Sequence, residues 1–180
     1  MNKTTLPQQN KDTPDDSTLG QVYETSLEKA LHQSKQADTS IHQLLDDVNN
    51  NTEDTSKTSS QPYSSEISKI KQSIKRDLTD AAHHLSETGK ELKDWLGFDI
   101  ALIKSELWLN FTEATDKTTL ELLKLQQSVA HAEYHTGEII GLGTLVCDKC
   151  KAYLHFHKPG HIPPCGKCYG THFHRLNHQA

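Results

Sequence analysis

The chain has 180 residues, of which 33% are hydrophobic and 24% charged, and its formal net charge at pH 7 is -5. This length accommodates one ordinary domain with tails, or one domain joined to a small metal-stabilised module. The low hydrophobic content limits the size of any core. Because the sequence contains neither a signal peptide nor an apolar run of bilayer length, we expect a cytoplasmic protein that does not enter the membrane.

The first third of the chain alternates between polar and weakly helical segments. Residues 1–20 are rich in Asn, Gln, Asp and Thr, and we expect a disordered tail because they bury too little apolar surface to offset the entropy of ordering. Residues 21–48 place apolar side chains at helical spacing on both sides of the polar run HQSKQADTS, which predicts one frayed helix or two short ones. Residues 49–62 form a polar linker by composition.

Residues 63–136 carry the clearest helical pattern of the chain. Ser64 or Ser65 can cap a first helix, and Gly89 supplies its end. The apolar positions of this helix form one stripe: Ile67, Ile70, Ile74, Leu78, Ala81 and Leu85. Spacing of three and four residues is typical of a helix that packs one face against a core.

Two further helices are predicted in the same region. One runs from Lys90 to Phe111, and its apolar face is wide enough to lie at the centre of the helical part or to meet a second copy of the chain. The other begins at a cap at Thr115 or Asp116 and ends near Tyr134. Because short connections join these helices, the sequence predicts a mainly α protein built on a helical hairpin, a small helical bundle or a coiled coil.

A glycine-containing segment, residues 137–146, follows the helices. Its run Gly141-Leu142-Gly143 lacks the third glycine of a dinucleotide-binding loop, since Val146 occupies that place. We therefore interpret the segment as a flexible joint rather than a nucleotide site. The joint is expected to connect the helices to a separate C-terminal unit, residues 147–180.

All the cysteines of the chain lie in this C-terminal unit, as two Cys-x-x-Cys pairs. Fourteen residues separate the pairs, which is close to the spacing of a four-cysteine zinc site. Each pair can wrap a tight turn whose N–H groups face thiolate sulfurs, and two such knuckles supply four ligands in a tetrahedron. We therefore predict one structural Zn²⁺ ion, bound by Cys147, Cys150, Cys165 and Cys168.

The residues between and after the pairs predict a small antiparallel sheet. Residues 153–157 alternate in the manner of a strand, and Lys158-Pro159-Gly160 turns the chain back. Residues 171–175 offer a second strand. Knuckles and short strands of this kind make a β zinc ribbon, which needs its metal because so few residues cannot form an adequate core.

Other uses of the cysteines fit the sequence less well. A redox dithiol of the thioredoxin type has one Cys-x-x-Cys at a helix N-terminus in an α/β setting, whereas here two pairs lie among strand and turn residues. Structural disulfides are disfavoured in a reducing compartment. Iron in the same tetrahedron of sulfurs is the main alternative to zinc.

Three runs of the sequence also resemble a known family. They are YHTGEIIGLGTLVCDKCKAYLHFHKPGHIPPCGKCYGTHFHR from Tyr134, LWLNFTEATDKTTLEL from Leu107, and IKRDL from Ile74. Together they resemble the YbeL-like family of bacterial proteins, over residues 20–180. This resemblance implies a helical region joined to a C-terminal zinc ribbon whose ligands fall on the four cysteines, and it implies no activity. The long polar N-terminus and the histidine-rich ribbon depart from the family pattern.

The composition of the site decides which functions we expect. Four thiolates leave no open position on the metal for water or substrate, so we expect a protein that is not an enzyme and has no catalytic residues. The main hypothesis is an adaptor that binds a protein partner, or itself, through its helices. From Thr144 onward five basic residues stand against Asp148 alone, and this mild bias makes nucleic acid a weaker hypothesis. The alternative is a thiol-based redox or zinc sensor whose ribbon unfolds on oxidation.

Overall fold

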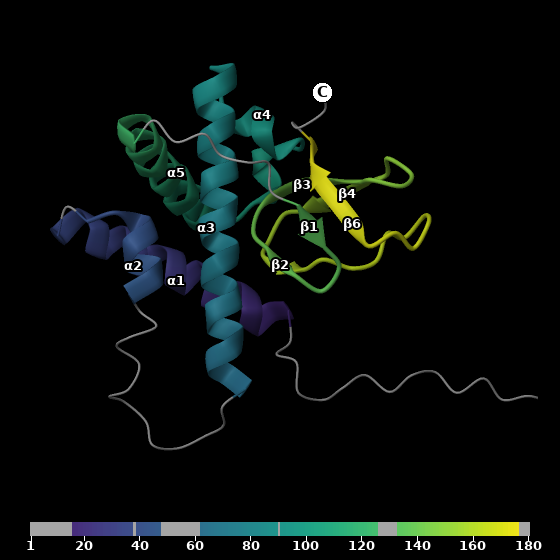
Figure 1. Ribbon diagram of the computed structural model, residues 1–180, viewed down its shortest axis with the longest axis horizontal. Helices are drawn as coiled ribbons and strands as arrows, with labels where there is room; N and C mark the ends of the chain where they lie inside the picture. The colour runs from purple at the N-terminus through teal and green to yellow at the C-terminus, as the bar shows by residue number, and fades with distance from the viewer. Residues whose placement is uncertain (1–15, 38, 48–61, 90, 126–132, 177–180) are drawn as a thin grey trace, which may run out of the picture.

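The computed structural model describes residues 16–37, 39–47, 62–89, 91–125 and 133–176. Helices gather on one side of the molecule and short strands on the other (Figure 1). The helices are α1 (Asp16–Ala37), α2 (Ile41–Asp47), α3 (Pro62–Thr88), α4 (Leu92–Leu96), the 3-10 helix η1 (Ile100–Leu102) and α5 (Ser105–Leu125). The strands are β1 (Tyr134–His135), β2 (Ile139–Ile140), β3 (Gly143–Cys147), β4 (Tyr153–Phe156), β5 (Gly160–His161) and β6 (His172–Arg175). The predicted class, mainly α with a C-terminal β ribbon, is confirmed.

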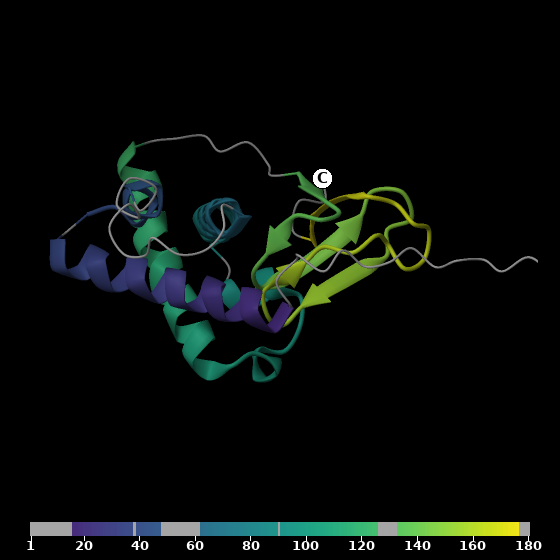
Figure 2. The same cartoon turned by 90° about the horizontal axis from the view of Figure 1, so that it is seen from below.

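Helix α3 lies at the centre and contacts α1, α2, α4, α5 and β2. Its predicted stripe is confirmed, since Ile70, Ile74, Leu78 and Ala81 are all buried, and Gly89 follows the helix with φ 62°. Figures 1 and 2 show that α1 and α5 run across α3 rather than along it. Of the arrangements the sequence allowed, the helices therefore form the small bundle.

The N-terminal predictions are partly corrected. The pattern in residues 21–48 resolves into two helices, α1 and α2, and α1 begins at Asp16 inside the segment expected to be disordered. Leu19, 1% exposed, belongs to the helical core, so apolar burial accounts for the order at this point. Residues 1–15 and most of the predicted linker, 48–61, lie outside the described residues.

The helix predicted from Lys90 to Phe111 is wrong, because the chain breaks in its middle. Gly97 ends α4 with φ 74°, and Asp99 then caps η1 by accepting a hydrogen bond from the N–H of Ala101 at 2.9 Å. A glycine in the left-handed conformation ends one helix, and an aspartate cap after it begins the next. The apolar pattern continued across the break because both halves pack on the same core.

The helix predicted from Thr115 to Tyr134 is also wrong at both ends. Helix α5 runs unbroken through Thr115, and Tyr134 belongs to β1. The hydroxyl of Thr115, which suggested a cap, donates instead to the carbonyl of Phe111 at 2.8 Å, and that of Thr118 donates likewise to Ala114 at 2.9 Å. This bonding satisfies the hydroxyl inside a helix. Leu120, an apolar residue of this segment, is 59% exposed.

The strands form two antiparallel sheets at the C-terminal side of the molecule (Figure 2). One has the order β1-β6-β3-β4 and the other pairs β2 with β5. The predicted strands in 153–157 and 171–175 are confirmed as β4 and β6. The ribbon has its own small core, in which Leu145, Ile162 and Phe173 pack beside the cysteines.

The flexible joint expected at 137–146 is wrong. Its residues form β2 and β3, and Ile139 and Leu142 are part of the helical core. The hydroxyl of Thr144 donates to the carbonyl of Leu96 at 2.6 Å, which ties β3 to the end of α4. The segment is therefore buried, and it packs between the helices and the sheet. None of the helices that the structure describes has the length and apolar character needed to cross a membrane.

Candidate metal centre and its link to the helices

Two turns of the same shape hold the four cysteines. In the first, Lys151 donates its N–H to the carbonyl of Cys147 at 2.9 Å, and in the second Tyr169 donates to Cys165 at 2.8 Å. Lys151 and Tyr169 both have left-handed backbones, with φ 59° and φ 56°. Each turn therefore closes on the residue after its second cysteine, which leaves both sulfurs of the pair facing the other turn.

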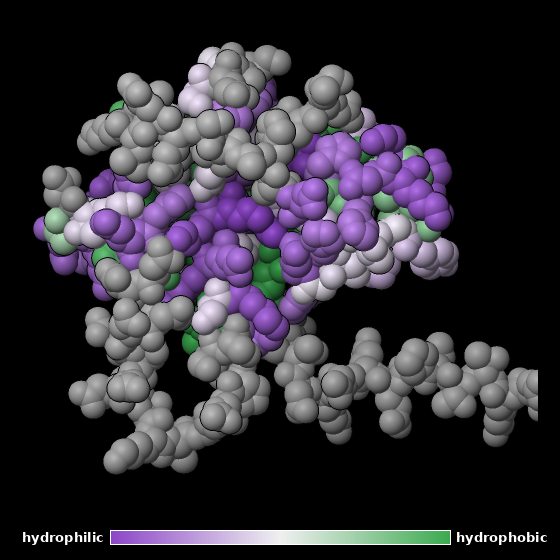
Figure 3. All heavy atoms as spheres, in the orientation of Figure 1, coloured by the Kyte–Doolittle hydropathy of each residue, from purple (hydrophilic) through white to green (hydrophobic). Residues whose placement is uncertain are grey.

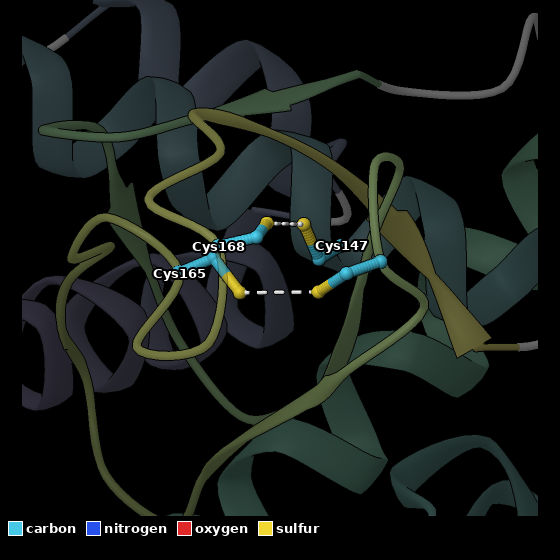
Figure 4. A group of neighbouring side chains, drawn as sticks. Cys147, Cys165 and Cys168 are labelled. Atoms are coloured by element: carbon cyan, nitrogen blue, oxygen red, sulfur yellow. Dashed lines mark hydrogen bonds between the residues drawn. The ribbon is translucent and has the colours of Figure 1, made fainter.

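The four sulfurs converge on one point (Figure 4). All lie within 4.8 Å of one another, and the closest pairs join the two turns: Cys147 to Cys168 at 3.6 Å and Cys150 to Cys165 at 3.5 Å. A tetrahedron with Zn–S bonds of 2.3 Å has sulfur–sulfur edges of about 3.8 Å, whereas a disulfide requires about 2.0 Å. The predicted ligands are thus placed as a tetrahedral metal site requires.

The surroundings of Cys165 favour its thiolate form, while the neighbouring sulfurs raise the pKa of Cys168. Backbone N–H groups of Lys167 and Cys168 lower the pKa of Cys165 to about 6, because hydrogen bonds to sulfur stabilise the thiolate, the form that binds metal. Soft thiolates in a tetrahedron select zinc or iron. When bound, such an ion would crosslink the two turns and leave no open coordination position.

The rest of the described chain holds no comparable cluster. Among the residues that can be placed, no other group of three or more Cys, His, Asp and Glu side chains gathers its ligand atoms as this one does. The histidines of the ribbon bond to other partners: His155 to Thr144 at 2.9 Å, and His174 to Asp148. Within the described residues, the candidate metal site therefore comprises Cys147, Cys150, Cys165 and Cys168.

Sequence reasoning missed a second feature, a buried polar network that joins the ribbon to the helices. At its centre is Arg175 of β6, 1% exposed. Its Nη2 donates to Asp77 Oδ1 at 2.7 Å, and its Nε lies 3.3 Å from Asp80 Oδ2. The guanidinium also donates to the hydroxyl of Tyr134 at 3.0 Å and the carbonyl of Leu142 at 2.7 Å. One ribbon side chain thus binds two carboxylates of α3.

The two carboxylates also hold other helices. Asp77 Oδ2 accepts from the hydroxyl of Tyr23 on α1 at 3.2 Å, and Asp80 Oδ2 accepts from the indole N–H of Trp95 on α4 at 2.9 Å. Burial raises the pKa of Asp77, while the charge of Arg175 opposes that rise. The network therefore ties α1, α3, α4 and β6 together. The sequence feature that could have indicated this network is the pair Asp77 and Asp80, three residues apart and next to the apolar stripe of α3.

Two glycines allow the backbone to approach this network. A Cβ on Gly141 would lie 2.2 Å from the Tyr23 hydroxyl, and one on Gly143 would lie 2.2 Å from Arg175 Nη1. The N–H of Gly141 donates to Asp77 Oδ2 at 2.6 Å, and Gly143 has φ 120°. Their role is close packing against buried polar groups, not the flexibility inferred from the sequence.

Comparison with known proteins agrees with this arrangement. The family model described as "Zinc-ribbon containing domain" matches residues 28–177. The protein described as "Uncharacterized protein YbeL", from three strains of Escherichia coli, is 36% identical over 111 residues, which cover 61% of this chain and 68% of YbeL. No solved structure matches the chain. With four converging cysteines that support zinc binding, the chain belongs to the family of proteins with a zinc-ribbon containing domain.

Proposed function

We propose that this protein is a non-enzymatic interaction module, in which a structural zinc ion holds the ribbon and the helices bind an acidic amphipathic segment of a partner protein. The observation that carries the proposal is a groove of about 1350 Å³ lined by α1, the end of α2 and the start of α3. Lys71 of α3 is one of its lining residues.

Lys71 gives the groove a binding chemistry. The residue is 6% exposed, and it makes no hydrogen bond or ion pair with any residue that the structure describes. Partial burial lowers the pKa of its amine, because the loss of contact with water disfavours the charged form. A carboxylate brought by a partner would relieve that cost.

The shape and remaining lining of the groove favour a helical partner. Apolar side chains lie on the helices around it: Val22, Ala30, Leu44, Leu45 and Ile67. The lining on α1 extends from Thr18 to Ala37, which corresponds to about 28 Å at the rise of an α-helix. Lys29 and His32 stand against Glu28, so the rim also favours an acidic segment. An amphipathic helix with one acidic residue on its apolar face matches these features.

The surface of the ribbon supports nucleic acid less well. Lys149, Lys151 and Lys167 are exposed beside the cysteines, but four thiolates with one divalent ion carry two negative charges, and Asp148 adds a third. This end of the molecule is therefore close to neutral. On the face in Figure 3, the described side chains are mostly hydrophilic, with hydrophobic ones in small separate patches.

The test selects binders from a displayed library of randomised 18-residue amphipathic helices, with zinc-loaded full-length protein as the target. We expect enriched sequences to carry Asp or Glu among their apolar positions. Their binding should be lost in Lys71→Met and kept in Lys69→Met, since Lys69 lies on the same helix but is exposed and paired with Glu66. Absence of enrichment, or binders that ignore Lys71, would reject the groove.

A thiol-based sensor is the second candidate, favoured by the exposure of the sulfurs. Cys150 and Cys168 are only partly buried, and each lies beside a sulfur of the other turn. Hydrogen peroxide could oxidise two thiolates to one disulfide, with two protons taken up and two waters formed, and the ion released. Zinc release by dilute peroxide, reversed by a thiol reductant, supports this role; zinc retained until the protein denatures counts against it.

A further inference from the structure

We propose that the Arg175 network is a latch through which occupancy of the cysteine site controls the packing of the helices. The inference rests on the proposed zinc binding and goes beyond it, because it assigns the ion an effect on the helical region. Its basis is that the guanidinium of Arg175 comes from the ribbon, whereas both carboxylates that it binds belong to α3.

Arg175 is connected to the metal site through strand β6. Strand β6 pairs with β3, so that Phe173 lies opposite Cys147, and Arg175 lies opposite Leu145. The N–H of Asp148, inside the first turn, donates to the carbonyl of His172 at 3.1 Å. The strand that carries Arg175 is therefore aligned directly on the first cysteine turn.

The second turn leads into the same strand. A Cβ on Gly170 would lie 3.1 Å from Cys147 Sγ and 3.3 Å from Cys168 Sγ, so the chain leaves the metal site in close contact with both turns just before β6 begins. The ribbon is too small to hold these strands by its own core. Without an ion to join the turns, β6 loses an anchor at its first residue, and the position of Arg175 is no longer fixed.

Displacement of the guanidinium would act on the helices through Asp77 and Asp80 of α3. Asp77 is 0% and Asp80 5% exposed, and the guanidinium of Arg175 forms an ion pair with each of them. Removing the guanidinium would take one direct ion pair from each of these two buried carboxylates, which disfavours the packed state. Opening of the bundle to water would relieve this cost by hydrating the two carboxylates.

Opening at this point would spread through the bundle. Tyr23 of α1 and Trp95 of α4 are bonded to the same two carboxylates, and Trp95 stacks on Phe111 of α5 with ring centroids 5.4 Å apart. Helix α1 also lines the groove proposed for a partner. Metal loss should therefore loosen α1 against α3 and weaken that groove together with the ribbon.

The experiment measures helical melting of the full-length protein by circular dichroism, zinc-loaded and after chelation, with metal content determined on each sample. Trp95 fluorescence in a Trp108→Phe background reports the network itself. We expect chelation to lower the helical melting temperature by at least about 10 °C and to shift Trp95 emission to the red. By linkage, Arg175→Met should weaken zinc binding about tenfold or more.

Matched variants separate the latch from general instability. The triple variant Asp77→Asn, Asp80→Asn and Arg175→Met removes the charges together, and its helical melting should no longer depend on zinc. Leu31→Ala weakens the buried helical core but leaves the latch intact, so its zinc dependence should persist. The triple variant also keeps the test decisive if Arg175→Met alone does not fold.

Two results would overturn the latch, and they are distinguishable. Zinc-loaded and chelated wild-type protein whose helices melt at the same temperature would reject the latch while leaving zinc binding in place. Protein that takes up no zinc would reject the metal site and the latch together. Peptide binding that depends on Lys71 is measured separately, so the test of the proposed partner groove is independent of the test of the latch.

Discussion

Gly143 shows how one residue without a side chain positions a buried charge. Its φ of 120° lies in a region that other residues rarely adopt, and the space where a Cβ would stand is filled by Arg175 Nη1. The wide ring of Trp95 lies on the same side, with its Cη2 3.5 Å from that position. Backbone, guanidinium and indole are therefore packed without room for a methyl group.

We predict that Gly143→Ala destabilises the protein by more than about 2 kcal/mol, from backbone strain and displacement of Arg175 together. Urea denaturation followed by circular dichroism measures the change. Gly160→Ala is the control, because a Cβ there meets no atom within 4 Å. Equal losses in the two variants would show that the contact with Arg175 is not the cause.

Lys71 leads to a prediction of the opposite sign. Replacing this partly desolvated amine with methionine should stabilise the protein by up to about 1 kcal/mol, because it removes a charge that has lost part of its contact with water. Since burial lowers the pKa of the amine in the folded state, the penalty is fully present below that pKa and disappears above the unfolded value of 10.5. The gain from Lys71→Met should thus shrink as the pH of the denaturation experiment rises from 7 to 10; a constant gain would contradict this origin.

Sequence reasoning succeeded for residues whose partners lie close in the chain. The spacing within Cys147 to Cys150 and Cys165 to Cys168 is a local pattern with one dominant chemical reading, so the metal ligands could be predicted. Asp77 and Arg175 are 98 residues apart, and nothing in the local pattern of either predicts that they meet. An arginine in a short, polar strand looks solvent-exposed until the packing of the helices against the sheet is known.

At the scale of elements, the errors have one cause. The spacing of apolar residues shows which side chains face the core. This spacing continues through the break at Gly97, because α4 and α5 pack against the same core. Helix ends depend instead on single backbone conformations and hydrogen bonds, such as Asp99 to Ala101. Long α3 has an uninterrupted stripe and a glycine end, and it was predicted nearly complete.

The short helix α4 depends on Trp95 more than on its own hydrogen bonds. The indole is 1% exposed, stacks on Phe111 and donates to Asp80. We predict that Trp95→Ala costs about 3 to 5 kcal/mol of unfolding free energy. Trp108→Ala, at a partly buried position on α5, should cost clearly less under the same urea titration; the reverse order would place the anchor of this region elsewhere.

At the scale of the whole molecule, helices and ribbon are expected to unfold as one unit. The sequence suggested two units with a joint, but β2 contacts α3, β3 contacts α4 and β5 contacts α1. We predict that the zinc-loaded protein shows coincident transitions when helix content and zinc release are followed in the same thermal melt, as two-state behaviour requires. Zinc released well before the helices melt would instead indicate two independent units.

The separation of 98 residues between Asp77 and Arg175 also orders events during synthesis. At elongation rates of 5 to 20 residues per second, α3 precedes its counter-charge by about 5 to 20 s. Throughout that interval the nascent helices carry two carboxylates that the finished protein buries, so the bundle cannot close in its final form while the ribosome is still making the ribbon. The last step in closing the bundle around Asp77 therefore follows the synthesis of β6, long after α3 itself has been made.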